Sequence, residues 1–314
     1  MVPGLRHSAV AACALIYNGM AFAFQLPVGA FADRLGLTTV LSAIGCFLIA
    51  LGGLIPSPVL MCILIGLGNA CFHAGGGREV LAQGGKRAGP VGVFVAPGAL
   101  GIFLGPKFAA LGWNLPPLLA LCMAVSGLAL CFRRKSAPPA PVPAALPGAL
   151  RKAAVILCFF LTVLLRSYMG TVLCYDAMNS PAFAAAFTGG IFFGKFLGGT
   201  LSDRWGTFRF CLSAQVLGTL LFPLSLSYPL LALPAIFLLN TTMAVTASKL
   251  YLCCPDYPGT MFGLTTFALY LGGIPRLLGW ENICFTAGGL LVLCILSACF
   301  LLAGLSFHRE EQYD

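Results

Sequence analysis

The 314-residue chain is 59% hydrophobic and only 9% charged, whereas soluble domains carry roughly 25% charged residues. A soluble globule has too little interior to bury so much apolar surface, which excludes a soluble protein and predicts an integral membrane protein. The net charge of +9 lies mostly in short connectors, as the positive-inside rule requires. It therefore indicates membrane topology and not a nucleic-acid partner.

Apolar stretches long enough to span a bilayer, about 20 residues each, recur along the whole chain. They do not alternate polar and apolar residues, so we predict an all-α protein and not a β-barrel. We predict eleven spans, at residues 8–31, 38–55, 57–81, 89–110, 113–132, 153–174, 182–201, 208–226, 229–252, 260–280 and 283–305.

A Pro- and Ala-rich segment, 133–152, is the predicted linker between a five-helix N-terminal bundle (1–132) and a six-helix C-terminal bundle (153–314). Its basic residues place it in the cytoplasm. With eleven spans of a cell-membrane protein, we expect the N-terminus outside and the C-terminus in the cytoplasm. The fourteen Cys residues show neither a disulfide framework nor metal spacing, so we expect no metal and no cofactor.

A short polar motif is written twice: GAFADRLG begins at Gly29, and GTLSDRWG begins at Gly199, 170 residues later. At nearly the same offset Gln25 matches Lys195, Asn69 matches Asn240, and Arg78 matches Lys249. Internal repeats of this kind are typical of secondary transporters, whose halves rock about a site between them. The span 153–174 has no counterpart in the first half, which we therefore predict to lack its first helix.

The duplicated motif resembles the cytoplasmic signature of the major facilitator superfamily, transporters built from two six-helix bundles related by a pseudo-twofold axis. The resemblance implies alternating access for a small-molecule substrate in the lipid bilayer, by a monomer. No nucleophile–base pair or phosphate loop is evident, so we do not expect an enzyme. The signature positions are Gly29, Asp33, Arg34 and Gly36 in the first copy and Gly199, Asp203, Arg204 and Gly206 in the second.

A second resemblance is to the antiporter signature that the same family carries in its fifth helix, where it is associated with drug/proton exchange. The matching positions are Gly92, Gly101, Gly105 and Pro106, with Ala109 and Ala110 in place of a final Gly pair. The segment GLGNACFHAGGG and the LLRSY around Arg166 also resemble efflux proteins of the fosmidomycin-resistance type.

Polar residues inside the spans are candidates for the substrate or proton pathway, because a charge at the bilayer centre costs about 2.5–3.5 kcal/mol. Arg166 either attracts an anion or pairs with a carboxylate. His73, with an ordinary pKa near 6.5, either carries the coupling proton or stays neutral against a backbone carbonyl. Lys195 either snorkels to the cytoplasmic surface or contacts substrate. The full candidate set is Gln25, Asn69, His73, Arg166, Lys195 and Asn240.

The Asp-Arg pairs are expected to work as gates on the cytoplasmic side. We expect Asp33 and Asp203 to cap the helix that follows each motif. The neighbouring Arg residues should face the anionic inner leaflet or pair across the domain boundary. Arg78 and Lys249 are expected to form gate salt bridges with Asp33 or Asp203.

These features predict a secondary active transporter, and first of all proton-coupled efflux of small amphipathic, drug-like molecules. The alternative transport direction is uptake of a small anionic metabolite, with Arg166 as the partner of the anion. An alternative of another class is a truncated, non-transporting membrane protein, since the first helix of the repeat is missing.

Overall fold

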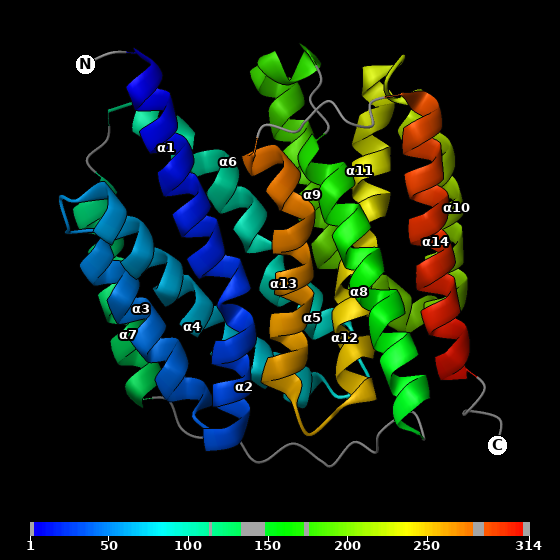
Figure 1. The fold of residues 1–314 in the computed structure, drawn as a ribbon, viewed down its shortest axis with the longest axis horizontal. Helices are drawn as coiled ribbons and strands as arrows, with labels where there is room; N and C mark the ends of the chain where they lie inside the picture. Colours follow the sequence, from blue (N-terminus) through cyan, green and yellow to red (C-terminus); the bar gives the residue numbers. More distant parts are fainter. Residues whose placement is uncertain (1–2, 113–114, 133–147, 173–175, 279–285, 310–314) are drawn as a thin grey trace. The chain divides into compact units, whose positions relative to one another are not determined.

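The computed structural model describes residues 3–112, 115–132, 148–172, 176–278 and 286–309. These residues are almost entirely helical, and no strand occurs among them (Figure 1). The elements are α1 (Pro3–Asn18), η1 (Gly19–Ala23), α2 (Gln25–Leu35), α3 (Thr38–Gly52), α4 (Pro58–Gly84), α5 (Gly89–Val95), α6 (Pro97–Ala110), α7 (Leu115–Phe132), α8 (Ala149–Val172), η2 (Asp176–Asn179), α9 (Pro181–Trp205), α10 (Thr207–Leu224), η3 (Pro229–Leu231), α11 (Ala232–Thr241), α12 (Met243–Cys253), α13 (Pro258–Leu277) and α14 (Ala287–Arg309).

Each of the predicted spans coincides with one helix or with a run of consecutive helices, which confirms the all-α membrane fold. Eight helical segments are long and apolar enough to cross a membrane, and the apolar helices Thr38–Gly52 and Pro116–Phe132 are shorter. The remaining span corresponds to α13. Residues 133–147 of the predicted linker lie outside the described residues, and α8 begins at Ala149, earlier than predicted.

Three of the predicted spans are interrupted, and a local cause is visible for two of the interruptions. A π-helix, η1, separates α1 from α2, and such segments are frequent at functional sites. The break between α5 and α6 precedes Pro97, whose ring restricts the residue before it and removes a hydrogen-bond donor. At the α11–α12 break, the hydroxyl of Thr241 donates to the carbonyl of Leu238 at 2.7 Å and so competes with helical bonding.

The chain forms two compact units whose limits differ from those of the predicted bundles. The helix pair α5–α6 joins helices of the second half up to Lys107, and the start of α13 joins helices of the first half. The bundles 1–132 and 153–314 thus stay a prediction about the repeat. Unit 1 comprises Met1–Ala82, Phe108–Pro139 and Asp256–Tyr270; unit 2 comprises Gln83–Lys107, Ala140–Pro255 and Leu271–Asp314.

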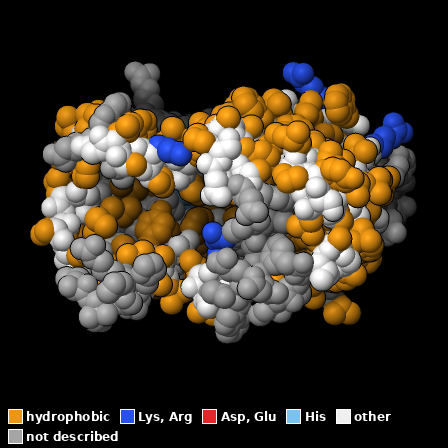
Figure 2. Space-filling model, turned by 90° about the horizontal axis from the view of Figure 1, so that it is seen from above, with side chains coloured by type: hydrophobic (Ala, Val, Ile, Leu, Met, Phe, Trp, Pro, Cys, Tyr) orange, Lys and Arg blue, Asp and Glu red, His pale blue; other side chains and the backbone are white. Residues whose placement is uncertain are grey.

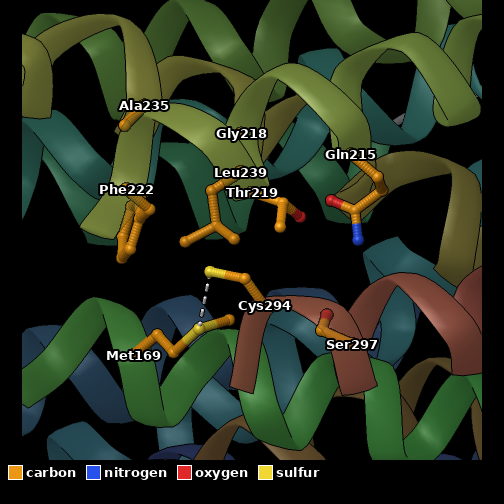
Figure 3. Close-up of a pocket in the computed structure, with 9 residues that line it drawn as sticks. All are labelled: Met169, Gln215, Gly218, Thr219, Phe222, Ala235, Leu239, Cys294 and Ser297. Atoms are coloured by element: carbon orange, nitrogen blue, oxygen red, sulfur yellow. Dashed lines mark hydrogen bonds between the residues drawn. The ribbon is translucent and has the colours of Figure 1, made fainter. Parts of the chain in front are cut away.

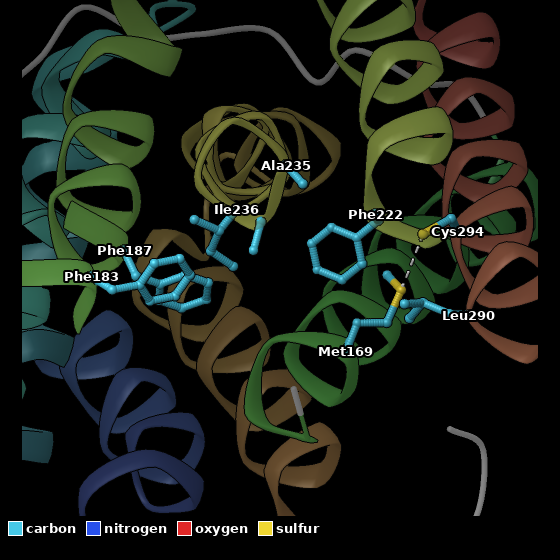
Figure 4. Packing of buried hydrophobic residues seen from close by; sticks show 9 residues of the cluster. Met169, Phe183, Phe187, Phe222, Ala235, Ile236, Leu290 and Cys294 are labelled. Atoms are coloured by element: carbon cyan, nitrogen blue, oxygen red, sulfur yellow. Dashed lines mark hydrogen bonds between the residues drawn. The ribbon is translucent and has the colours of Figure 1, made fainter. Parts of the chain in front are cut away.

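Each unit has a core of apolar side chains. In unit 1, residues from α2, α3 and α4 pack together, among them Ala32, Leu41 and Ala74. In unit 2, aromatic and sulfur-containing side chains from α8, α9, α10, α11 and α14 meet (Figure 4). There the thiol of Cys294 donates to the sulfur of Met169 at 3.6 Å. These contacts matter as close packing, because lipid removes the hydrophobic drive for helices to associate.

The outer surface of the described helices is apolar. Large hydrophobic side chains such as Ile102 and Leu220 are 77% and 59% exposed. In Figure 2, hydrophobic side chains cover most of the coloured surface and Lys and Arg are isolated. Lipid tails satisfy such a surface, whereas water would not.

We expect Gly198→Ala to destabilise unit 2, because α9 and α11 approach each other there without room for a side chain. A Cβ on Gly198 would overlap the carbonyl oxygen of Thr241, and overpacking of this kind costs about 1–3 kcal/mol. Gly189→Ala in the same helix is the control, since a Cβ there meets no atom within 4 Å. The measurement is the Tm of the purified protein; equal Tm values for both variants would contradict the close approach.

Candidate functional site

The carboxylate of Asp33, near the end of α2, binds the start of a helix far away in the sequence. Its side chain is only 2% exposed. It accepts the backbone N–H of Gly259 at 2.8 Å and of Thr260 at 2.7 Å, and also the Thr260 hydroxyl at 2.8 Å. These residues open α13, where the first N–H groups have no intrahelical acceptor and the helix dipole favours a negative charge.

Asp203, near the end of α9, makes the matching contact in unit 2. Its two carboxylate oxygens accept the backbone N–H of Ala88 at 2.9 Å and of Gly89 at 2.8 Å. Gly89 is the first residue of α5. Each aspartate of the repeated motif therefore holds the N-terminus of a helix that belongs to the other half of the chain.

The two contacts are related by the repeat itself. Gly259 follows Gly89 by the same 170 residues that separate Asp203 from Asp33. Exchanging the halves therefore converts the contact of Asp33 with Gly259 into that of Asp203 with Gly89. Sequence reasoning missed these helix starts as partners, although this shared offset was the signal that could have revealed them.

The prediction that each aspartate caps the helix directly after it is wrong. The N-cap residues of α3 and α10, Leu37 and Gly206, make no side-chain capping bond, and both carboxylates are engaged elsewhere. Instead, a left-handed glycine turns the chain between motif and following helix: Gly36 has φ 67° and Gly206 has φ 85°. Glycine adopts this conformation without the strain that a side chain brings.

The first glycine of each motif permits the close approach on which the aspartate contact depends. A Cβ on Gly29 would overlap the carbonyl oxygen of Gly259, and a Cβ on Gly199 would overlap that of Ala88. The two helices in each pair therefore touch backbone to backbone beside the carboxylate. A side chain at either glycine would push the helix start out of reach.

The basic residues around the aspartates differ in their contacts. Arg78 of α4 forms the expected ion pair with Asp33, with 3.1 Å between Nε and Oδ1. Lys249, its counterpart in the repeat, lies close enough to Asp203 for electrostatic attraction, but these two described side chains form no direct ion pair. The two Arg residues of the motif, Arg34 and Arg204, are exposed.

Arg166 is a buried cation in the last third of α8 and is only 7% exposed. Its guanidinium donates to the hydroxyl of Thr242, and through Nη2 to the hydroxyl of Thr246 at 3.0 Å. No carboxylate forms an ion pair with it among the residues that the structure describes. The two hydroxyl groups satisfy two of its five N–H donors but do not compensate its charge, which is costly inside a membrane.

In the described part of unit 1, two polar side chains carry buried oxygens without a hydrogen-bond donor. Gln25 is 1% exposed, and its Nε2 donates to the carbonyl of Ala21 at 2.6 Å. Among the described residues, neither its Oε1 nor the Oδ1 of Asn69 has a hydrogen-bond partner. By contrast Asn240, the counterpart of Asn69 in the repeat, donates to the carbonyl of Ile236 at 2.8 Å.

His73 and Lys195 are both half-buried within their helices. The imidazole of His73 meets the ring of Phe72 edge-on at 5.5 Å between ring centroids. Lys195 lies where α9 meets α5. Its carbonyl oxygen is so close to Gly92 that it would overlap a Cβ on that residue. This close approach repeats the one between Gln25 and Gly263 in unit 1.

The antiporter-like positions are only partly used for packing in the described structure. Gly92 makes the close approach to α9, whereas a Cβ on Gly101 or Gly105 would meet no atom within 4 Å. Pro106 lies inside α6, ahead of the helix end at Ala110. Of the antiporter-like glycines Gly92, Gly101 and Gly105, Gly92 makes a close helix contact in the described structure, with α9.

A small, mostly apolar cavity lies in unit 2, and none of the predicted site residues lines it. It measures about 10 Å³, which is room for about one water molecule. Figure 3 shows Gln215 of α10 and Ser297 of α14 at this cavity, beside Met169 and Cys294. The buried hydroxyl oxygen of Ser297 has no partner among the described groups.

Neither a protein-family model nor a curated protein sequence matches this chain. Solved structures do. The E. coli fucose:proton symporter FucP is 14% identical with a TM-score of 0.67, covering 96% of this chain and 90% of that one. The human organic anion transporter MFSD10 is 16% identical with a TM-score of 0.67, covering 96% and 83%. A bacterial homologue of the iron transporter ferroportin is 14% identical with a TM-score of 0.61, covering 97% and 90%.

We expect Asp33→Asn and Asp203→Asn to loosen the helix starts that these residues hold. Each substitution removes the negative charge and turns an acceptor oxygen into a donor that faces a backbone N–H, at a cost of about 1–3 kcal/mol. Hydrogen exchange should rise at Gly259 and Thr260 in the first variant and at Ala88 and Gly89 in the second. The control is Asp256→Asn, at an exposed position; unchanged exchange in both variants would contradict the assignment.

Proposed function

We propose that this chain, which has the fold of the major facilitator transporters, is a secondary active transporter that works by alternating access. The pair of exchange-related aspartate contacts carries the proposal. Each one ties a helix of one half to a helix of the other. Contacts that form in one state and break in another bias the equilibrium between the two.

In this proposal the carboxylates serve as latches at the ends of α2 and α9. Asp33 is held by two backbone N–H groups, one hydroxyl and Arg78, and Asp203 by two backbone N–H groups. These partners lie near helix ends, where water can replace them when the contact opens. A latch of this type releases at a modest cost, because no charge is left buried without a partner.

We further propose proton-coupled efflux of small amphipathic molecules as the first candidate activity. The antiporter-like pattern supports it through Gly92, which lets α5 approach α9. His73 is the candidate proton carrier, since it is the titratable group of the first-half spans whose ordinary pKa is nearest neutrality, about 6.5. The predicted spans carry no Asp or Glu at their centres.

Arg166 favours a second candidate, the transport of a small organic anion. A buried guanidinium whose partners are two hydroxyls would gain from an anionic ligand that neutralises its charge. One solved transporter of this fold is described as an organic anion transporter, and another as a fucose:proton symporter. Uptake of an anionic metabolite in symport with protons would unite both properties.

The direction of solute transport relative to that of the proton can be tested in proteoliposomes with a pH-sensitive dye in the lumen. Organic anions and amphipathic cationic dyes are added outside, one at a time. Exchange predicts that an accepted solute makes the lumen more alkaline, whereas symport makes it more acidic. A non-transporting membrane protein gives neither response to any solute, and that result would overturn the proposal.

We expect Arg166→Gln to reduce transport of organic anions at least tenfold and to leave cationic solutes unaffected, because the substitution keeps hydrogen-bond donors and removes the charge. Arg209→Gln is the matched control, because this residue is exposed at the start of α10. Equal losses for anions and cations would show that Arg166 supports the fold and does not select the solute. Tm measurements on both variants separate unfolding from a loss of selectivity.

A further inference from the structure

Two thiols of unit 1 lie side by side, Cys13 on α1 and Cys62 on α4. Both are free and partly accessible, and the two side chains are close enough to interact electrostatically. Other cysteines are bound differently: the thiol of Cys253 donates to the carbonyl of Lys249, and Cys294 contacts Met169. The pair of Cys13 and Cys62 therefore joins two helices that are separate in the sequence.

The helix packing one turn further along shows how close the two backbones come. A Cβ on Gly66 would lie 3.1 Å from the carbonyl oxygen of Tyr17 and 2.7 Å from the Cβ of Met20. Cys13 and Cys62 precede Tyr17 and Gly66 by about one helical turn each, so they occupy the same facing sides of α1 and α4. A disulfide requires two Cα atoms about 4.4–6.8 Å apart, and a backbone approach of this kind allows such a separation.

The position of the pair in the membrane makes it accessible. The spans Ala9–Leu35 and Pro58–Gly84 run in parallel, and each Cys lies in the first turns of its span. The thiols therefore lie close to one membrane surface, about 6 Å along the helix from the span ends at 1.5 Å per residue. A water-soluble oxidant can reach that depth more readily than it can reach a thiol at the bilayer centre.

We propose that Cys13 and Cys62 form a dithiol that closes into a disulfide linking α1 to α4. Two S–H bonds break and one S–S bond forms, while two electrons and two protons pass to the oxidant. The oxidant is a diazene such as diamide in the test tube, which becomes the hydrazine, or an oxidised dithiol carrier in the cell. The disulfide would hold α1 to α4 on the side of the π-helix η1 that is remote from Asp33.

The bond can be detected by cutting the chain between the two cysteines. A protease site inserted after Pro56, in the α3–α4 connection, separates residues 1–56 from the rest of the folded protein. After diamide treatment and cleavage in detergent, we expect the fragments to stay joined on a non-reducing gel and to separate on reduction. Peptide mass spectrometry of the uncut protein provides the same answer without the insertion, as a cross-linked peptide two hydrogens lighter than its parts.

Single substitutions identify the partners. Cys13→Ser and Cys62→Ser should each abolish the joined product, whereas Cys46→Ser should leave it, since Cys46 lies on the same fragment and is fully buried. Oxidation should also raise the Tm of the natural sequence and not that of Cys62→Ser, because the cross-link restricts the unfolded chain. Separated fragments after oxidation of the folded protein, or a joined product that survives Cys13→Ser, would overturn the proposal.

Discussion

The structure depends on a carboxylate placed at the free N–H groups of a distant helix start, and it uses this interaction twice. Asp33 holds α13 and Asp203 holds α5, so each half of the repeat donates one helix start to an aspartate of the other. The glycines beside the aspartates bring the helices into backbone contact. This exchange explains why the compact units cut across the sequence halves: α5 packs with α9, and the start of α13 packs with α2.

Much of the fold could be predicted because hydropathy is a local property of the sequence, and because a repeat can be found by comparing the sequence with itself. A run of apolar residues specifies a span wherever its neighbours lie, and the eleven spans were therefore found. The partners of the aspartates could not be predicted in the same way. Capping of the next helix is the nearest solution in the sequence, whereas Gly259 follows Asp33 by more than two hundred residues. The left-handed turn at Gly36 separates Asp33 from the start of α3, and Asp33 does not cap that helix.

Buried polar residues of the spans occur in both units. Among the described residues, unit 1 holds the unpartnered oxygens of Gln25 and Asn69, and unit 2 holds the buried cation of Arg166. These residues could be identified from the sequence as polar residues within apolar spans, because polar side chains are costly in lipid. Sequence reasoning could not identify Thr242 and Thr246 as the partners of Arg166, because hydroxyls inside a helix ordinarily bond to their own backbone.

The aspartate contacts suit a switch because each of them is modest. Each hydrogen bond from a neutral N–H group to a carboxylate contributes about 1.5–3 kcal/mol, and water can replace the N–H group at a helix end. A fully buried ion pair would leave an unpaired charge on opening, at a cost of about 3–5 kcal/mol. Inverting a two-state population from 1:99 to 99:1 takes about 5.5 kcal/mol. A latch made of a few such bonds can therefore hold one state, and the ion pair of Asp33 has a partly exposed partner, Arg78, which water can solvate when the contact opens.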